Sequence, residues 1–181
     1  MNTPGSELGR ADRRHLDAAE GWLGLGTWSE ALQELEQISP AMQTHPQVLW
    51  VRCVVFCEAR NWDECVKVAA RLVELMPQTD FPWINRAYAL RRTADGGLQA
   101  AYDALLPAAD KVDDVQTVAF NLACYTCQMG RIDEARAWLK RSFAAARARG
   151  QFKQLKQQAL EEPDLAPLHK EIAEPQSGPD L

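Results

Sequence analysis

The sequence predicts an all-α protein built from repeated helix pairs, and two observations carry that prediction. The segment Trp28–Leu32 (Trp-Ser-Glu-Ala-Leu) returns 34 residues later as Trp62–Val66 (Trp-Asp-Glu-Cys-Val). No run alternates between apolar and polar residues in the way that a half-buried strand does. A motif repeated at this period is typical of proteins whose stacked units share one extended core.

The repeat continues through a third and a fourth unit. Ile132–Arg136 carries the motif again, and its Ala135 follows Ala101 by the same 34 residues. The step from Cys65 to Ala101 is 36 residues. Asp95-Gly96-Gly97 accounts for the difference as a lengthened turn inside the third unit.

Each unit is expected to consist of two amphipathic helices joined by a short turn. Gly26 and Gly130 stand where a helix must end and reverse. Thr27–Glu30 matches a helix-capping pattern, and Asn61–Glu64 is close to one. The expected helices, in order, are 12–25, 28–39, 46–59, 62–76, 82–93, 98–111, 114–129 and 132–148.

The spacing of small and large residues in these helices resembles the tetratricopeptide-repeat signature. The small residue of the first helix is matched by Ala19, Cys53, Ala87 and Ala123, and that of the second helix by Ala31, Cys65, Ala101 and Ala135. The large residue of the first helix is matched by Trp22, Phe56 and Leu90, with Thr126 in the fourth unit. The resemblance implies a right-handed α-solenoid of four antiparallel helix pairs with C-terminal capping helices.

We expect one repeat array between two loosely ordered ends. The array is predicted to span 12–173, with units at about 12–45, 46–79, 80–115 and 116–149. Residues 150–173 are predicted to cap it, because a terminal unit must cover its outer apolar face. The tails are 1–11 and 174–181, the second of which is predicted to be disordered.

Composition and charge exclude several classes of protein. A net charge of −5 argues against a general nucleic-acid binder. The first residues are polar and charged, unlike a secretory leader, and no apolar run approaches the roughly 20 residues of a membrane span. We therefore expect a cytoplasmic protein with no nucleic-acid or membrane partner. The basic segment 131–156 is interpreted as a solvated helix face, with an acidic partner as the alternative.

The resemblance also indicates which residues line a concave groove, because first helices form that face in the family. The candidate partner-binding residues are Trp50, Val54, Phe81, Ile84, Asn85, Tyr88, Arg91, Arg92, Phe120 and Cys124. Aromatic and Arg side chains often carry interface energy, so this lining indicates non-catalytic binding of a peptide or protein segment. The alternative is a structural or oligomerising repeat protein whose groove the chain itself fills. The sequence does not decide between a monomer and a homodimer.

One binding mode of the family is not expected. Some members hold a C-terminal carboxylate through a clamp of Lys, Asn and Arg side chains in this groove. Here Leu16, Glu20, Val51 and Phe81 occupy most of the corresponding positions, and only Asn85 is chemically suited.

The cysteines are interpreted as small packing residues. Cys124 and Cys127 lie late in a helix, without the strand-to-helix context of a redox motif. Zinc takes four ligands, and the Cys53–Cys57 pair lies two units away. With no phosphate-binding loop or catalytic triad in the sequence, we expect no enzymatic activity, no cofactor and no metal.

Overall fold

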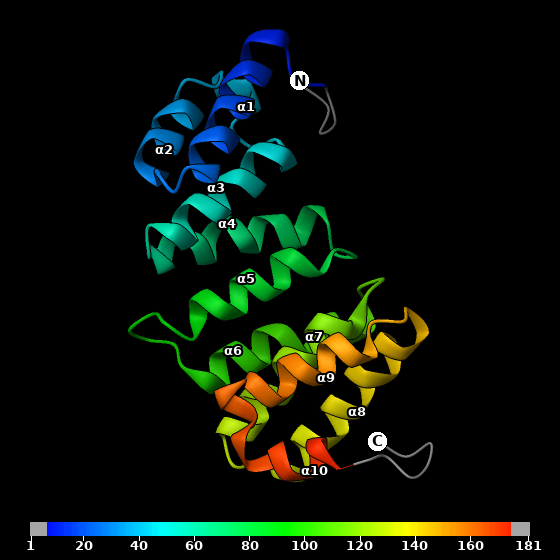
Figure 1. Ribbon diagram of the computed structural model, residues 1–181. Coiled ribbons are helices and arrows are strands. Elements are labelled where there is room, and N and C mark those ends of the chain that lie inside the picture. Colours follow the sequence, from blue (N-terminus) through cyan, green and yellow to red (C-terminus); the bar gives the residue numbers. More distant parts are fainter. Residues whose placement is uncertain (1–6, 175–181) are drawn as a thin grey trace. The chain divides into compact units, whose positions relative to one another are not determined.

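The computed structural model describes residues 7–174 as a chain of helices (Figure 1). The α-helices are α1 (Arg10–Gly24), α2 (Trp28–Glu36), α3 (Pro46–Glu58), α4 (Trp62–Leu75), α5 (Asp80–Leu90), α6 (Leu98–Leu105), α7 (Val115–Gln128), α8 (Ile132–Ala148), α9 (Phe152–Glu161) and α10 (His169–Ala173). Three 3-10 helices join them: η1 (Pro40–Met42), η2 (Leu106–Asp110) and η3 (Pro163–Leu168). This range contains no β-strand, so the predicted all-α class is confirmed.

The ends of the described range bear on the expected tails and on the expected start of the first helix. Residues 1–6 and 175–181, most of the two expected tails, lie outside it. Inside it, α1 begins at Arg10, two residues before the expected start. Within 7–174, none of the helices has both the length and the apolar character needed to cross a bilayer.

The chain divides into two compact units at Met76–Pro77. The first unit contains α1–α4, and the second contains α5–α10. Within the units, consecutive helices pack as pairs: α1 with α2, α3 with α4, α5 with α6, and α7 with α8. This is the predicted series of four helix pairs.

The helix pairs are held together at the small-residue positions. All eight of them have no exposed surface: Ala19, Cys53, Ala87, Ala123, Ala31, Cys65, Ala101 and Ala135. Short side chains at facing positions let two helix backbones approach closely and pack without voids. The large-residue positions vary more, because Thr126 is fully buried whereas Trp22 keeps 38% of its surface exposed.

Four helix ends share one hydrogen-bonding pattern, in which an N–H donates to the carbonyl five residues earlier. These bonds are Thr27 to Trp22, Asn61 to Phe56, Arg131 to Thr126, and Gln151 to Ala146. The preceding residue is left-handed in each case: Gly26 (φ 75°), Arg60 (φ 54°), Gly130 (φ 75°) and Gly150 (φ 70°). The pattern is the Schellman motif, and it confirms the predicted reversals at Gly26 and Gly130. Among these four ends, only that of the second pair has a left-handed residue other than glycine.

The lengthened turn of the third pair depends on its two glycines. The Gly97 N–H donates to the Leu90 carbonyl at 3.0 Å, with Gly97 at φ 112°. A Cβ atom on Gly96 would lie 1.8 Å from the Leu90 carbonyl oxygen. The turn therefore folds back so tightly over the end of α5 that no side chain fits at Gly96.

The cap expected at Thr27 and the helix expected over 98–111 both differ from the structure. The Thr27 hydroxyl donates to the Trp22 carbonyl of the ending helix and does not cap α2, while the Asn61 side chain caps α4 as expected. Thr27 lies three residues after α1 ends, so its hydroxyl adds to the backbone N–H groups that the Trp22 carbonyl at that helix end already accepts. The helix expected over 98–111 is α-helical only to Leu105, because Pro107 lacks the N–H that continues an α-helix.

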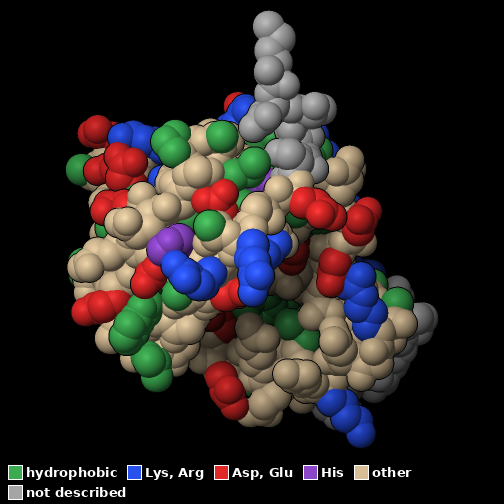
Figure 2. Space-filling model, turned by 90° about the horizontal axis from the view of Figure 1, so that it is seen from above, with side chains coloured by type: hydrophobic (Ala, Val, Ile, Leu, Met, Phe, Trp, Pro, Cys, Tyr) green, Lys and Arg blue, Asp and Glu red, His purple; other side chains and the backbone are tan. Residues whose placement is uncertain are grey.

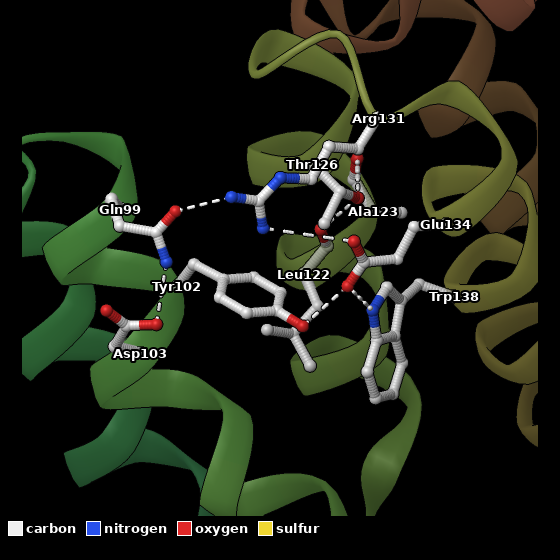
Figure 3. Close-up of polar contacts among 9 residues, drawn as sticks. All are labelled: Gln99, Tyr102, Asp103, Leu122, Ala123, Thr126, Arg131, Glu134 and Trp138. Atoms are coloured by element: carbon white, nitrogen blue, oxygen red, sulfur yellow. Dashed lines mark hydrogen bonds and ion pairs between the residues drawn. The ribbon is translucent and has the colours of Figure 1, made fainter.

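A polar network joins the third and fourth pairs (Figure 3). The Tyr102 hydroxyl of α6 donates to the Glu134 carboxylate of α8 at 2.5 Å, and the Trp138 indole N–H reaches the same oxygen at 3.4 Å. Arg131 donates to the Gln99 side chain at 2.6 Å. Burial, followed by the Glu134 carboxylate, raises the pKa of Tyr102 to about 12, so the phenol remains a donor at neutral pH.

The C-terminal helices cap the fourth pair, as predicted. The rings of Phe143 in α8 and Phe152 in α9 meet edge to face with centroids 5.4 Å apart. The Arg136 guanidinium donates two hydrogen bonds to the Glu171 carboxylate, at 2.7 and 2.9 Å. Leu165 and Leu168 of η3 are buried.

The turn at Arg60 yields a stability prediction. A left-handed residue with a Cβ atom costs roughly 1–2 kcal/mol, which glycine largely avoids. Replacing Arg60 with Gly should therefore raise the free energy of unfolding by about 0.5–1 kcal/mol in a urea titration. The reciprocal control, Gly130→Ala, should lower it by about 1 kcal/mol or more. Destabilisation by Arg60→Gly would show that the Arg60 side chain contributes more than the backbone strain costs.

Candidate functional site

The second unit carries a hollow between α5 and α7 that the C-terminal segment closes on a third side. It encloses about 530 Å³. Its lining residues are Tyr88, Arg91, Arg92, Thr117, Phe120, Asn121, Cys124, Tyr125, Gln158, Glu162 and Asp164. We call it the α5–α7 hollow. Five of these residues, from Tyr88 to Cys124 in chain order, are among the predicted partner-binding residues: Tyr88, Arg91, Arg92, Phe120 and Cys124.

Tyr88 and Arg92 form a stacked pair at the mouth of the hollow. The Arg92 guanidinium carbon lies 3.4 Å from the centre of the Tyr88 ring, and one of its nitrogens donates to the Tyr88 carbonyl at 2.9 Å. Tyr88 keeps 41% of its surface exposed. The two side chains therefore offer a flat surface that joins an aromatic ring with a cation.

Arg91 is held by the C-terminal segment. It donates to the Asp164 carboxylate of η3 at 2.5 Å, and both side chains are more than two-thirds buried (28% and 19% exposed). The hydrogen bond to Asp164 raises the pKa of Arg91. The sequence predicted both arginines as groove residues, but Arg91 already has a carboxylate partner from the same chain.

The floor of the hollow is apolar and buried. Phe120 and Cys124 of α7 each keep 5% of their surface exposed. Burial, reinforced by the negative charges of Glu162 and Asp164, raises the pKa of the Cys124 thiol. The thiol is therefore protonated at neutral pH and is a poor nucleophile.

Tyr125 is an unusual buried polar group beside this floor. Its surface is 2% exposed, and its hydroxyl has no hydrogen-bond partner among the described residues. Burial raises the pKa of Tyr125 to about 12, so the hydroxyl keeps its proton. The Arg91 guanidinium lies 5.7 Å from its ring centre. A buried hydroxyl without a partner marks a place where a polar atom of a ligand would gain a hydrogen bond.

Three of the predicted residues lie earlier on α5 and do not line the α5–α7 hollow. Phe81, Ile84 and Asn85 are half-buried. The Asn85 amide donates to the Phe81 carbonyl at 2.9 Å, within its own helix. Asn85, the one residue at the clamp positions that is chemically suited to a clamp, thus donates to the backbone of its own helix.

The remaining two predicted residues belong to the first unit. Trp50 is half-buried and lines a hollow of about 250 Å³ with Glu20, Pro46, Gln47, Val51 and Met76. Val54 is half-buried and lies on α3 outside that lining.

Sequence reasoning missed the third wall of the α5–α7 hollow. Gln158, Glu162 and Asp164 come from the segment that was predicted only as a cap. Arg91 and Asp164 are 73 residues apart in the sequence. Asp164 lies after the last repeat unit, so aligning the repeats with one another could not predict this contact. The acidic pair Glu161-Glu162, next to a helix-ending proline, was the one available signal.

The face of the molecule drawn in Figure 2 carries charges of both signs. Figure 2 shows acidic and basic side chains interspersed over one face of the molecule. This agrees with the small net charge of −5.

Comparison with known proteins identifies the fold. No protein-family model matches the sequence, and no curated protein matches it significantly. Among solved structures, the chain is similar to an RS-1 MamA double mutant (TM-score 0.65, 13% identity, 92% of this chain and 91% of that one). It is also similar to a MamA protein (0.61, 14%, 94% and 100%) and to the tetratricopeptide-repeat protein TTC0263 of Thermus thermophilus (0.60, 16%, 90% and 95%). The chain therefore has the tetratricopeptide-repeat fold.

The Arg91–Asp164 ion pair should contribute measurably to stability, because both side chains are largely shielded from water. In a double-mutant cycle with Arg91→Ala and Asp164→Ala, we expect a coupling energy of about 1–3 kcal/mol. The exposed Lys67–Glu64 pair is the matched control, with an expected coupling below about 1 kcal/mol. Urea denaturation of the four variants in each cycle supplies both values. Equal couplings would mean that η3 is held by its apolar residues alone.

Proposed function

We propose that this chain is a non-catalytic protein-interaction module that binds a peptide or protein segment in the α5–α7 hollow. The observation that carries the proposal is the exposed Tyr88 ring, held under the Arg92 guanidinium at the mouth of the hollow. Aromatic and Arg side chains beside a buried apolar floor are the arrangement most often found at binding hot spots. Stacked helix pairs commonly use their concave face in this way.

The rim of the hollow suits an extended peptide. Thr117, Asn121 and Gln158 place hydroxyl and amide groups around the apolar floor. Such groups can hydrogen-bond to the N–H and C=O groups of a peptide backbone, while the floor accepts one apolar side chain. The Tyr125 hydroxyl adds a further polar contact once a ligand reaches the floor.

The charges of the hollow favour a ligand of low net charge. Arg91, Arg92, Glu162 and Asp164 all line it, and Arg91 is already paired with Asp164. A strongly acidic peptide would meet two carboxylates, and a strongly basic one would meet two guanidinium groups. The sequence alone indicated two arginines in the groove and no acidic neighbours. The acidic residues of the lining therefore limit the expected ligand to one of low net charge.

The proposed role is non-catalytic. The thiol at the floor, Cys124, is kept protonated by burial, so it is a poor nucleophile. The cytoplasmic location expected from the sequence fits a chain that uses its cysteines as reduced thiols.

The other predicted residues extend the proposed surface. Trp50 and Val54 in the first unit, and Phe81, Ile84 and Asn85 on α5, are half-buried. Trp50 lines the hollow of its own unit, where an apolar side chain would fit beside Val51 and Met76. We propose these residues as additional contacts and not as the main anchor.

A second role is favoured by one specific observation. The Arg91–Asp164 ion pair and the packing of η3 on α7 support this role, because both hold the C-terminal segment against the helices that line the hollow. A structural or oligomerising repeat protein, for example a homodimer, would use its groove in this way. Sedimentation equilibrium across a hundredfold range of protein concentration separates a monomer from a concentration-dependent oligomer.

Peptide selection tests the binding role directly. Linear peptides selected from a phage-displayed library on the wild-type protein should bind roughly tenfold or more weakly to Tyr88→Ala, as truncation of a hot-spot residue predicts. Trp28→Ala is the matched control, because Trp28 is an aromatic residue of similar exposure (42%) in the other unit. It should leave Kd unchanged within about threefold. Fluorescence anisotropy with labelled peptides measures both values. Peptides that bind wild type and Tyr88→Ala equally would place the binding site elsewhere.

A further inference from the structure

The first unit contains a cluster of three cysteines that the proposed function does not use. The Sγ atoms of Cys57 and Cys65 are 3.1 Å apart, and those of Cys53 and Cys65 are 3.8 Å apart. All three sulfur atoms lie within 4.8 Å of one another. Cys53 and Cys65 are fully buried, whereas Cys57 is half-buried.

The cluster is built on two packed helices. Cys53 and Cys57 are four residues apart on α3, which puts their side chains on one face of that helix. Cys65 projects from the first turn of α4, the partner helix of the same pair. Three ligand atoms from two packed helices form a site that exists before any ligand arrives.

The repeat itself shows that packing does not require these thiols. The residues equivalent to Cys53 and Cys65 are alanines in every other pair: Ala19 and Ala31, Ala87 and Ala101, and Ala123 and Ala135. The residues equivalent to Cys57 are Leu23, Arg91 and Cys127. Alanine satisfies the close helix contact equally well, so the coincidence of three cysteines in the second pair calls for a chemical explanation.

We propose that Cys53, Cys57 and Cys65 bind one thiophilic d10 metal ion, Cu(I) or Zn(II), through three thiolates. Soft thiolate ligands select these ions over hard cations such as Mg²⁺ and Ca²⁺. Binding replaces the three thiol protons, which leave for solvent, and involves no change of oxidation state.

The sulfur separations fit this coordination. Zn–S bonds of about 2.3 Å at tetrahedral angles place sulfur atoms about 3.8 Å apart. The Cys53–Cys65 separation of 3.8 Å matches that value, and the 3.1 Å separation to Cys57 requires only a small side-chain rotation. Cys57, at the exposed edge, gives an ion its entry path. Three sulfurs complete a trigonal Cu(I) site, whereas Zn(II) would add a solvent ligand at that edge.

Sequence reasoning did not find this site. It compared Cys53 and Cys57 with Cys124 and Cys127, which lie in the other unit, and treated Cys65 only as the small residue of its helix. However, both small positions are fully buried in every pair, and in the second pair the Cys65 sulfur lies 3.8 Å from that of Cys53.

Metal retention by the full chain tests the proposal. Protein prepared anaerobically and fully reduced is incubated in separate arms with Zn(II) and with Cu(I), desalted, and analysed for bound metal by mass spectrometry. We expect about one ion per chain in at least one arm. The variants Cys53→Ala, Cys57→Ala and Cys65→Ala should each bind at least about tenfold more weakly.

The chain supplies its own controls. Alanine at positions 53 and 65 is what the other helix pairs carry, and circular dichroism checks that each variant is folded. The variant Cys124→Ala/Cys127→Ala removes the two remaining thiols and should retain the ion at the wild-type level.

Failure of wild type to retain either ion would overturn the proposal. Equal retention by Cys57→Ala would also overturn it, and the half-buried position of Cys57 makes this the mildest of the three substitutions. The metal proposal concerns the first unit alone, so its failure would leave the proposed peptide binding in the second unit standing.

Discussion

Close contact between the two helices of each pair is the constraint on which the rest of the structure depends. A helix of 9 to 15 residues, such as α2 or α1, is marginal alone and gains its stability by burying one face against a neighbour. The small residues at the crossing points set how near the neighbour comes. The distance between paired helices in turn sets the positions of the turns and the depth of the hollow beside α7. It also brings three sulfur atoms together beside α4.

The sequence was sufficient to predict the features that repeat from one helix pair to the next. Ala87 and Ala101 could be assigned to a buried contact because they align with Ala19 and Ala31, and Gly130 could be assigned to a reversal because it aligns with Gly26. Arg60 stands at the same place without being glycine, so its residue type did not indicate its left-handed backbone. Thr27 shows the limit of local patterns, since its hydroxyl could serve either of two adjacent helix ends.

The sequence could not supply contacts that lie outside the register. Asp164 reaches Arg91 from a segment without a repeat partner, so no alignment of the chain with itself could pair them. For the same reason the hollow looked more basic in sequence than it is, because Glu162 and Asp164 were not expected in it. Tyr125 could be placed on a buried helix, but its lack of a hydrogen-bond partner among the described residues depends on every neighbouring side chain at once.

The ion pair between Arg91 and Asp164 divides the molecules into those in which it is closed and those in which it is open. A ligand that competes for Arg91 can bind only those molecules in which the link is open. Its observed affinity is then its intrinsic affinity multiplied by the open fraction. Under the proposed function, the C-terminal segment would be a tethered competitor whose effective concentration is set by the chain, and ligand binding in the second unit would be thermodynamically coupled to local opening of η3.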